Sequence, residues 1–152
     1  MNPPNPQNTT SPATPDLLYL RFAEIFNSRD YSRLGEVLAE DFVDHHPGLV
    51  DVDCLSTYAR NLEAVIDALD MTAAPHEVVA AGDRVFTRVE LTGRHVGPFL
   101  GLAPTGNAVA WHTHELWLVR DGRLAERWAV DDLLTLTAQL GVPQPAWTGH
   151  AA

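Results

Sequence analysis

The 152-residue sequence has one cysteine, no run of Lys or Arg, and no long apolar segment. Because Cys54 has no second cysteine to pair with, an internal disulfide is excluded and a reducing compartment is expected. The formal net charge of -10 and the lack of a basic stripe argue against nucleic acid or an anionic membrane surface as a partner. The apolar runs are too short for a membrane span, and the first residues lack the basic and apolar regions of a secretory signal. We therefore expect a cytoplasmic protein.

The composition is that of one globular domain, with 45% hydrophobic and 20% charged residues. Residues 1–13 are rich in Pro, Asn, Thr and Ser and carry almost nothing to bury, which predicts a disordered N-terminal tail. We assign residues 14–142 to the folded domain and residues 143–152 to a C-terminal tail.

The first half of the domain has the 3.6-residue period of amphipathic helices. Thr14-Pro15-Asp16 is typical of a helix start, because it offers a capping residue, a proline suited to the first turn and an acid favoured by the helix dipole. We predict helices at 14–27 and 31–39, an extended piece at 41–48, and a helix that Asp51 or Asp53 caps and that ends near Leu69.

In the second half the period changes to two, which predicts strands at 72–80, 84–94, 108–120 and 123–130. Asp121-Gly122 indicates a tight hairpin, because this pair suits a turn with positive φ. A closing helix is predicted at 132–140, and the loop 97–106, apolar but rich in Gly and Pro, is predicted to be a lid or rim over an apolar opening. Helices followed by a strand meander predict an α+β domain.

Three segments resemble the SnoaL-like polyketide cyclases of the NTF2-like superfamily: Phe42-Val-Asp-His-His-Pro, the Leu91–Gly106 segment with its Gly-Arg-His-Val-Gly-Pro sequence, and the Leu118–Leu134 segment around Asp121-Gly122. The similarity covers roughly residues 17 to 141. It implies a cone-shaped fold with a curved antiparallel sheet against N-terminal helices, a functional site inside the cone, and a homodimer. It also implies intramolecular aldol ring closure on polyketide esters without a metal or an organic cofactor.

The family's acid/base residue, an Asp in the last strand, falls on Ala129 when positions are counted from Asp121-Gly122. The helper His of the preceding strand falls on Glu115, and the acid that opens the last helix is present as Asp132. The resemblance thus implies the same cone with a changed catalytic pair.

Glu115 is the catalytic residue that we rank first. In a strand at 108–120 it shares a face with Trp111, Thr113 and Trp117, and the resemblance implies that this face lines the cavity. Burial among tryptophans raises the pKa of a carboxyl, which suits a general base acting on a carbon acid. The alternative is a structural ion pair with Arg88 or Arg127.

Asp132, Arg127 and His46 are the further catalytic candidates, as proton or oxyanion partners. Each has a structural alternative: Asp132 suits a helix cap, Arg127 suits the ion pair with Glu115, and His46 suits a half-exposed turn. A register shift or a bulge in the last strand could bring Asp131 to the place of Ala129.

No metal and no cofactor are predicted. His112 and His114 point to the face opposite Glu115 and lack further ligands at a zinc-like spacing, which favours a dimer interface. An apolar, polyoxygenated, polyketide-like small molecule is the expected ligand. The predicted substrate-binding residues are aromatic: Phe26, Tyr58, Phe99, Trp111 and Trp117.

The sequence therefore predicts a cyclase or a related cofactor-independent enzyme of secondary metabolism that forms an enolate in an apolar cavity. Two alternatives stay open. One is a cofactor-independent hydroxylase or isomerase on the same cone, and the other is a non-catalytic small-molecule binding module.

Overall fold

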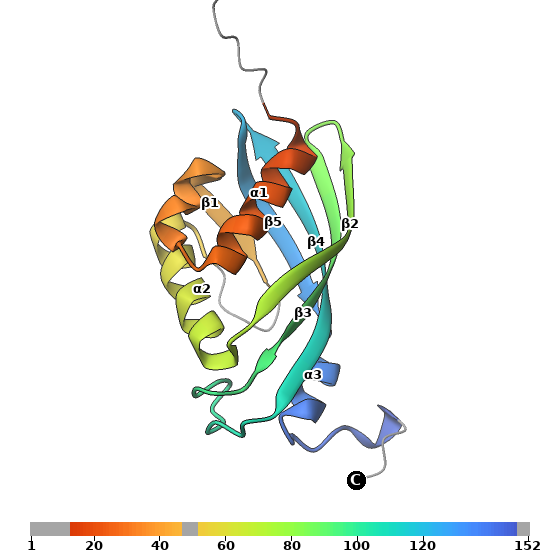
Figure 1. Cartoon of the computed structure of the whole chain (residues 1–152). Helices are drawn as coiled ribbons and strands as arrows, with labels where there is room; N and C mark the ends of the chain where they lie inside the picture. Colours follow the sequence, from red (N-terminus) through yellow and green to blue (C-terminus); the bar gives the residue numbers. More distant parts are fainter. Residues whose placement is uncertain (1–12, 47–51, 149–152) are drawn as a thin grey trace, which may run out of the picture.

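The computed structural model describes residues 13–46 and 52–148. The chain forms both helices and strands (Figure 1). In chain order they are α1 (Pro15–Ser28), the 3-10 helix η1 (Tyr31–Glu36), β1 (Leu38–His45), α2 (Leu55–Leu69), β2 (Thr72–Ala81), β3 (Arg84–Arg94), β4 (Ala108–Arg120), β5 (Arg123–Asp131), α3 (Leu133–Gln139) and the 3-10 helix η2 (Ala146–Thr148).

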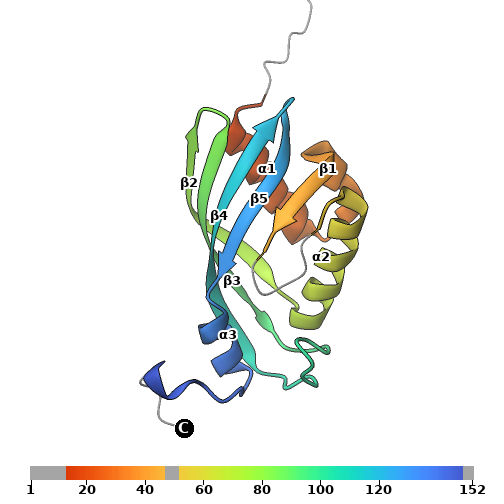
Figure 2. The ribbon, with the colours of Figure 1, turned by 180° about the vertical axis from the view of Figure 1, so that it is seen from behind.

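The five strands form one curved sheet in the order β1-β5-β4-β3-β2, which is visible from behind in Figure 2. The predicted meander of β2 to β5 is confirmed, and its pairs are all antiparallel. The extended piece predicted at 41–48 begins three residues earlier than expected, at Leu38, and pairs with β5 in parallel; residues 47 and 48 lie outside the described residues. The second predicted helix is correspondingly shorter and ends at Glu36, because the chain from Leu38 onward is bound to the sheet edge.

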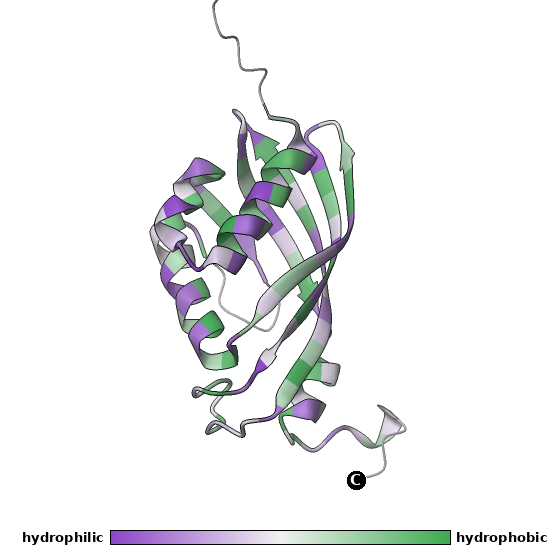
Figure 3. Ribbon diagram, in the orientation of Figure 1, coloured by the Kyte–Doolittle hydropathy of each residue, from purple (hydrophilic) through white to green (hydrophobic). Residues whose placement is uncertain are grey.

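The helices α1 and α2 cover the concave face of the sheet, and α3 lies at its lower end (Figure 1). The apolar positions of α1 that face the sheet, among them Leu18, Phe22 and Ile25, are buried, and Figure 3 shows hydrophobic colour gathered on the inner sides. The Asn27 side chain links the C-terminal end of α1 to β2: it accepts from the Ala73 backbone N–H and donates to the Ala73 carbonyl, each at 2.8 Å. This pair fixes the end of α1 against β2.

Two local features of the sequence shape the sheet. Asp121 and Gly122 both have positive φ, at 51° and 72°, which is the predicted tight hairpin turn between β4 and β5. Gly93 in β3 allows the end of α2 to approach closely, because a Cβ there would overlap the carbonyl oxygen of Leu69.

The predicted cap of α2 and the two predicted terminal tails compare with the structure as follows. The residue that precedes α2 is Cys54, whose side chain makes no capping hydrogen bond, so the predicted cap by Asp53 is wrong; Asp51 lies outside the described residues. Residues 1–12 of the predicted N-terminal tail and residues 149–152 of the C-terminal tail also lie outside them. Within the described part of the chain, no helix is long and apolar enough to cross a membrane.

Candidate functional site: a cavity with one polar strip

A cavity of about 330 Å³ lies between the concave face of the sheet and the helices. Most of its wall is aliphatic or aromatic, with residues such as Phe22, Leu62 and Val89. Its charged lining is confined to one place, which we call the polar strip. The polar strip consists of Asp44, His46, Glu115, Arg127 and Asp131.

Strand alternation explains why the polar strip exists. Side chains two residues apart point to the same side of a strand, so Asp44 and His46 share one face of β1 and its extension. The same rule places Arg127 and Asp131 on the inner face of β5. The strand register then joins the groups, since Asp44 lies beside Arg127 in the β1–β5 pair and Glu115 follows on β4.

Arg127 is the centre of the polar strip. Its guanidinium donates from Nε and Nη2 to the two oxygens of Asp44, both at 2.7 Å, and from Nη1 to Glu115 Oε1 at 3.1 Å. Its Cζ lies 5.4 Å from the ring centroid of Tyr58 and 5.3 Å from that of Trp117, within the range of cation–π attraction. Burial alone would lower the pKa of Arg127; Tyr58, Asp44 and Glu115 reverse this and hold it well above its ordinary value.

Glu115 is buried and accepts hydrogen bonds on both oxygens. Oε2 accepts from the Thr87 hydroxyl at 2.9 Å and from the Trp117 indole at 3.1 Å, and Oε1 accepts from Arg127. The ion pair that sequence analysis held as the alternative for Glu115 is therefore present. These three donors hold the carboxylate in one orientation.

His46 and Asp131 form the second half of the polar strip. The imidazole Nε2 of His46 hydrogen-bonds to Asp131 Oδ2, and Trp111 Nε1 donates to Asp131 Oδ1 at 3.0 Å. Because the Arg127 Nη2 group lies 3.2 Å from His46 Nδ1 and can only donate, Nδ1 accepts and Nε2 carries the hydrogen. Burial acts to raise the pKa of Asp131, but the hydrogen bonds from His46 and Trp111 and the nearby guanidinium of Arg127 outweigh it, and the pKa is lowered.

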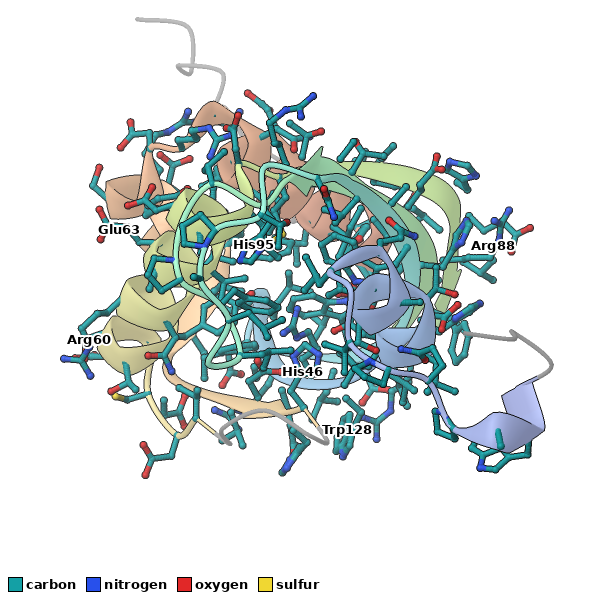
Figure 4. The ribbon with its side chains drawn as sticks, turned by 90° about the horizontal axis from the view of Figure 1, so that it is seen from below. His46, Arg60, Glu63, Arg88, His95 and Trp128 are labelled. Carbon is teal, nitrogen blue, oxygen red and sulfur yellow. The ribbon has the colours of Figure 1, made fainter. Side chains whose placement is uncertain are left out.

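Figure 4 looks into the lower end of the fold and shows which labelled side chains belong to the interior. His46 points inward, toward the side chains that fill the middle of the view, whereas Arg60, Glu63, Arg88 and Trp128 lie around the outside. Arg88 is therefore directed away from Glu115, and of the two arginines considered as its partner only Arg127 reaches it.

Three of the four predicted catalytic residues, Glu115, Arg127 and His46, line the cavity. Asp132 does not. It is exposed, and its carboxylate caps α3, accepting from the Thr135 backbone N–H at 3.0 Å and from the Thr135 hydroxyl at 2.6 Å. The prediction that Asp132 acts inside the cavity is thus corrected: β5 turns its neighbour inward, and Asp132 faces outward at the strand end.

Four of the predicted substrate-binding aromatics, Phe26, Tyr58, Phe99 and Trp111, line the cavity. Trp117 does not. It is fully buried behind the polar strip, where its indole holds Glu115 and its ring lies against Arg127. Its place is structural support for the site, because a ligand in the cavity has no access to its ring.

The list of catalytic candidates drawn from the sequence omitted two members of the polar strip. Asp44 lies two residues after Phe42 and two before His46, so strand alternation alone could have placed it inside. Asp131 needs neither a register shift nor a bulge, because it lies on the same face as Arg127 and Ala129; the β4–β5 register is regular from Thr113 to Leu118. Asp131 therefore does not take the place of Ala129, but lies two residues further along the same face.

The outer face of the sheet carries the two histidines of β4. His112 is partly buried and His114 is exposed, and they point away from the cavity, as alternation predicts. Across residues 13–46 and 52–148, no group of three or more His, Cys, Asp or Glu side chains is arranged to hold a metal ion.

Comparison with known proteins assigns the family. The family of SnoaL-like polyketide cyclases matches residues 16–140, and the chain belongs to it. Among curated proteins, none matches this chain.

Solved structures agree with this assignment. IdmH, a proposed polyketide cyclase from Streptomyces antibioticus, is 33% identical over 82% of this chain and 96% of its own, with a TM-score of 0.72. AclR, a proposed hydroxylase from Streptomyces galilaeus, is 29% identical over 83% of this chain and 95% of its own, with a TM-score of 0.73. A SnoaL-like protein from Jannaschia sp. CCS1, at 22% identity over 88% of this chain and 96% of its own, has a TM-score of 0.78 and supports the fold.

Proposed function

We propose that this protein is a cofactor-independent cyclase of polyketide-type substrates in which Asp131 is the acid/base. The observation that carries the proposal is the position of the Asp131 carboxylate: it lines an apolar cavity and is held in place by His46 and Trp111. A carboxylate in such a site can remove a proton next to a carbonyl, and the surrounding apolar wall keeps water away from the enolate.

Asp131 is favoured over Glu115, the residue that ranks first from the sequence. Glu115 accepts three hydrogen bonds, one of them from the guanidinium of Arg127, so fewer of its lone pairs are free to take a substrate proton. Asp131 accepts one hydrogen bond on each oxygen and leaves lone pairs for a substrate proton. In this proposal Glu115 and Asp44 position Arg127, which stabilises the negative charge of the enolate.

The proposed reaction needs no oxidant or reductant. Asp131 takes a proton from the carbon next to a carbonyl, and the C–H electron pair becomes the enolate. The enolate carbon then bonds to a second carbonyl carbon of the same molecule, and the resulting alkoxide takes the proton back from Asp131. The product is an isomer of the substrate, and positioning of the two carbonyls supplies much of the acceleration.

Ala129 fits this arrangement. It is fully buried and lies opposite Glu115 in the strand register, so a carboxylate at position 129 would face that of Glu115 directly. Moving the acid two residues along the same face, to Asp131, places it beside Thr113 instead. We propose that Asp131 takes over the role that the family assigns to the Asp at the position of Ala129.

The charge of the polar strip defines the substrate further. The polar strip has three carboxylates and one guanidinium: Asp44 and Glu115 pair with Arg127, and Asp131 contacts His46. An additional carboxylate in the cavity would be repelled at low dielectric, so the proposed substrates are uncharged esters, ketones or lactones.

The test is incubation of the protein with a panel of polyketide esters and lactones, followed by mass spectrometry under air and under nitrogen. The proposal expects a product of unchanged mass in both atmospheres that disappears with Asp131→Asn. If every product is heavier by one oxygen and requires air, the cyclase proposal is wrong.

Hydroxylation is the second candidate, and the observation that favours it is the similarity to AclR, a proposed hydroxylase. It differs from cyclisation in requiring oxygen. The binding-module alternative differs from both, because it expects a ligand to be bound and recovered unchanged.

We also propose a homodimer formed through the outer face of the sheet. An apolar row, defined as Val79, Phe86, Leu116 and Trp128, runs across four neighbouring strands in register. Val79, Phe86 and Trp128 are exposed, and a contiguous apolar row of this kind is rare on a monomer surface. Two copies related by a two-fold axis can cover each other's rows.

A further inference from the structure

Two hydroxyl groups in the cavity wall have no hydrogen-bond partner among the described residues. They belong to Tyr58 on α2 and Thr113 on β4. Both side chains line the cavity and are only 3% exposed. A buried hydroxyl without a partner is unfavourable, so such groups mark positions that a bound molecule can satisfy.

Their locations relate them to the polar strip. Thr113 pairs in register with Asp131 across β4 and β5, so an oxygen bound by Thr113 lies next to the proposed base. The Tyr58 ring carries the Arg127 guanidinium against its face, and both α2 and β4 contribute to the cavity wall. Burial raises the pKa of Tyr58, so its hydroxyl stays protonated and can donate.

Two further unpartnered buried atoms, Tyr31 Oη and His95 Nε2, show that this property alone is not sufficient. Neither of these residues lines the cavity. Tyr58 and Thr113 combine the unpartnered hydroxyl with a place in the wall beside the polar strip.

We infer that Tyr58 and Thr113 are substrate-binding residues that each hydrogen-bond one oxygen of an uncharged, flat, polyoxygenated ligand, with the Thr113 hydroxyl holding the carbonyl whose neighbouring carbon faces Asp131. The inference rests on the proposed function for the role of that carbonyl. The hydrogen bonds themselves are independent of turnover, because they are formed on binding.

The test uses variants that remove only the hydroxyl, Thr113→Val and Tyr58→Phe, and a matched control, Thr87→Val. The Thr87 hydroxyl already has a partner in Glu115. The first measurement is urea unfolding without ligand. Thr87→Val is expected to lower the unfolding midpoint, whereas Thr113→Val and Tyr58→Phe leave it unchanged or raise it, because they remove no protein hydrogen bond.

The second measurement is binding by tryptophan fluorescence, with anthraquinone as the oxygenated probe and anthracene as the probe of the same shape without oxygen. Each hydroxyl deletion is expected to weaken anthraquinone binding about 3- to 10-fold and to leave anthracene binding unchanged. Unchanged anthraquinone binding in both variants overturns the inference. So does a lowered unfolding midpoint in both, because it would show that the hydroxyls have protein partners. If the hydroxyl deletions weaken anthraquinone binding as expected but the protein turns over no substrate, the proposed function is refuted and the two binding residues stand.

Discussion

The imidazole of His46 and the carboxylate of Asp131 are hydrogen-bonded across 85 positions of the sequence. One comes from the end of the first strand and the other from the end of the last, and the parallel pairing of β1 with β5 brings them together. This contact joins the Arg127 half of the polar strip to the proposed base, since His46 also accepts from Arg127. His46 therefore connects the ion-paired Arg127 with the proposed base, Asp131.

Replacement of Arg127 by Met should destabilise the protein strongly. It would leave the carboxylates of Asp44 and Glu115 buried without their cation, at an expected cost of about 3–5 kcal/mol in the free energy of unfolding. The matched control is Arg120→Met, which removes an exposed pair with Asp41 and should cost about 0.5 kcal/mol or less. Urea unfolding of the three proteins measures both values, and similar costs for the two variants would contradict the central place of Arg127.

Acidification should remove the contribution of Asp131 to stability. Its pKa in the folded protein is lowered, so the folded state favours the ionised form, and the stabilisation is complete above the unfolded value of about 3.9 and lost as pH falls through the folded value. The difference in unfolding free energy between the wild type and Asp131→Asn should thus shrink as the pH falls from about 4 toward the lowered pKa of the folded state. A difference that grows over this window would show that the sign of the pKa shift is wrong.

Charge should separate substrates that are otherwise alike. A methyl ester and the corresponding free acid differ by one negative charge, and the three carboxylates of the polar strip disfavour the acid. We expect kcat/KM for the acid to be at least about tenfold lower. Asp132→Asn, which removes a carboxylate outside the cavity, should preserve the ratio. Equal turnover of ester and acid by the wild type would contradict the predicted selectivity for uncharged substrates.

The apolar row on the outer face of the sheet predicts the oligomeric state. The wild type should have the mass of a dimer in light scattering after size-exclusion chromatography, and Phe86→Asp should have the mass of a monomer, because it places a charge within the row. Leu20→Asp changes an equally exposed apolar residue on α1 and should remain a dimer. A monomeric wild type, or a dimer that survives Phe86→Asp, argues for a different surface.

The sequence predicted most of the sheet because its signals are local. Alternation placed Glu115 and Trp117 on the inner face, and Asp121-Gly122 marked the hairpin that aligns β4 with β5. The parallel partner of β5 could not be predicted in this way, since the pairing between residues 38–45 and 124–128 joins two segments about 80 residues apart in the sequence, which no local period encodes.

The same distinction explains the errors at the site. The role of Asp131 depends on whether the end of β5 turns Asp131 or Asp132 toward the cavity. The strand ends at Asp131, one residue later than predicted, and it is therefore Asp131 that faces the cavity. Asp44 was missed because its importance comes from Arg127, which reaches it only through the β1–β5 pairing.

The most direct test of the account is hydrogen–deuterium exchange at the carbon next to the carbonyl of α-tetralone, a two-ring ketone, followed by NMR in heavy water. It measures proton abstraction without requiring ring closure. We predict that the wild type and Asp132→Asn accelerate exchange, and that Asp131→Asn reduces the enzymatic rate by about 100-fold or more. Undiminished exchange by Asp131→Asn, with loss of exchange in Glu115→Gln, would contradict the assignment and return the role of base to Glu115.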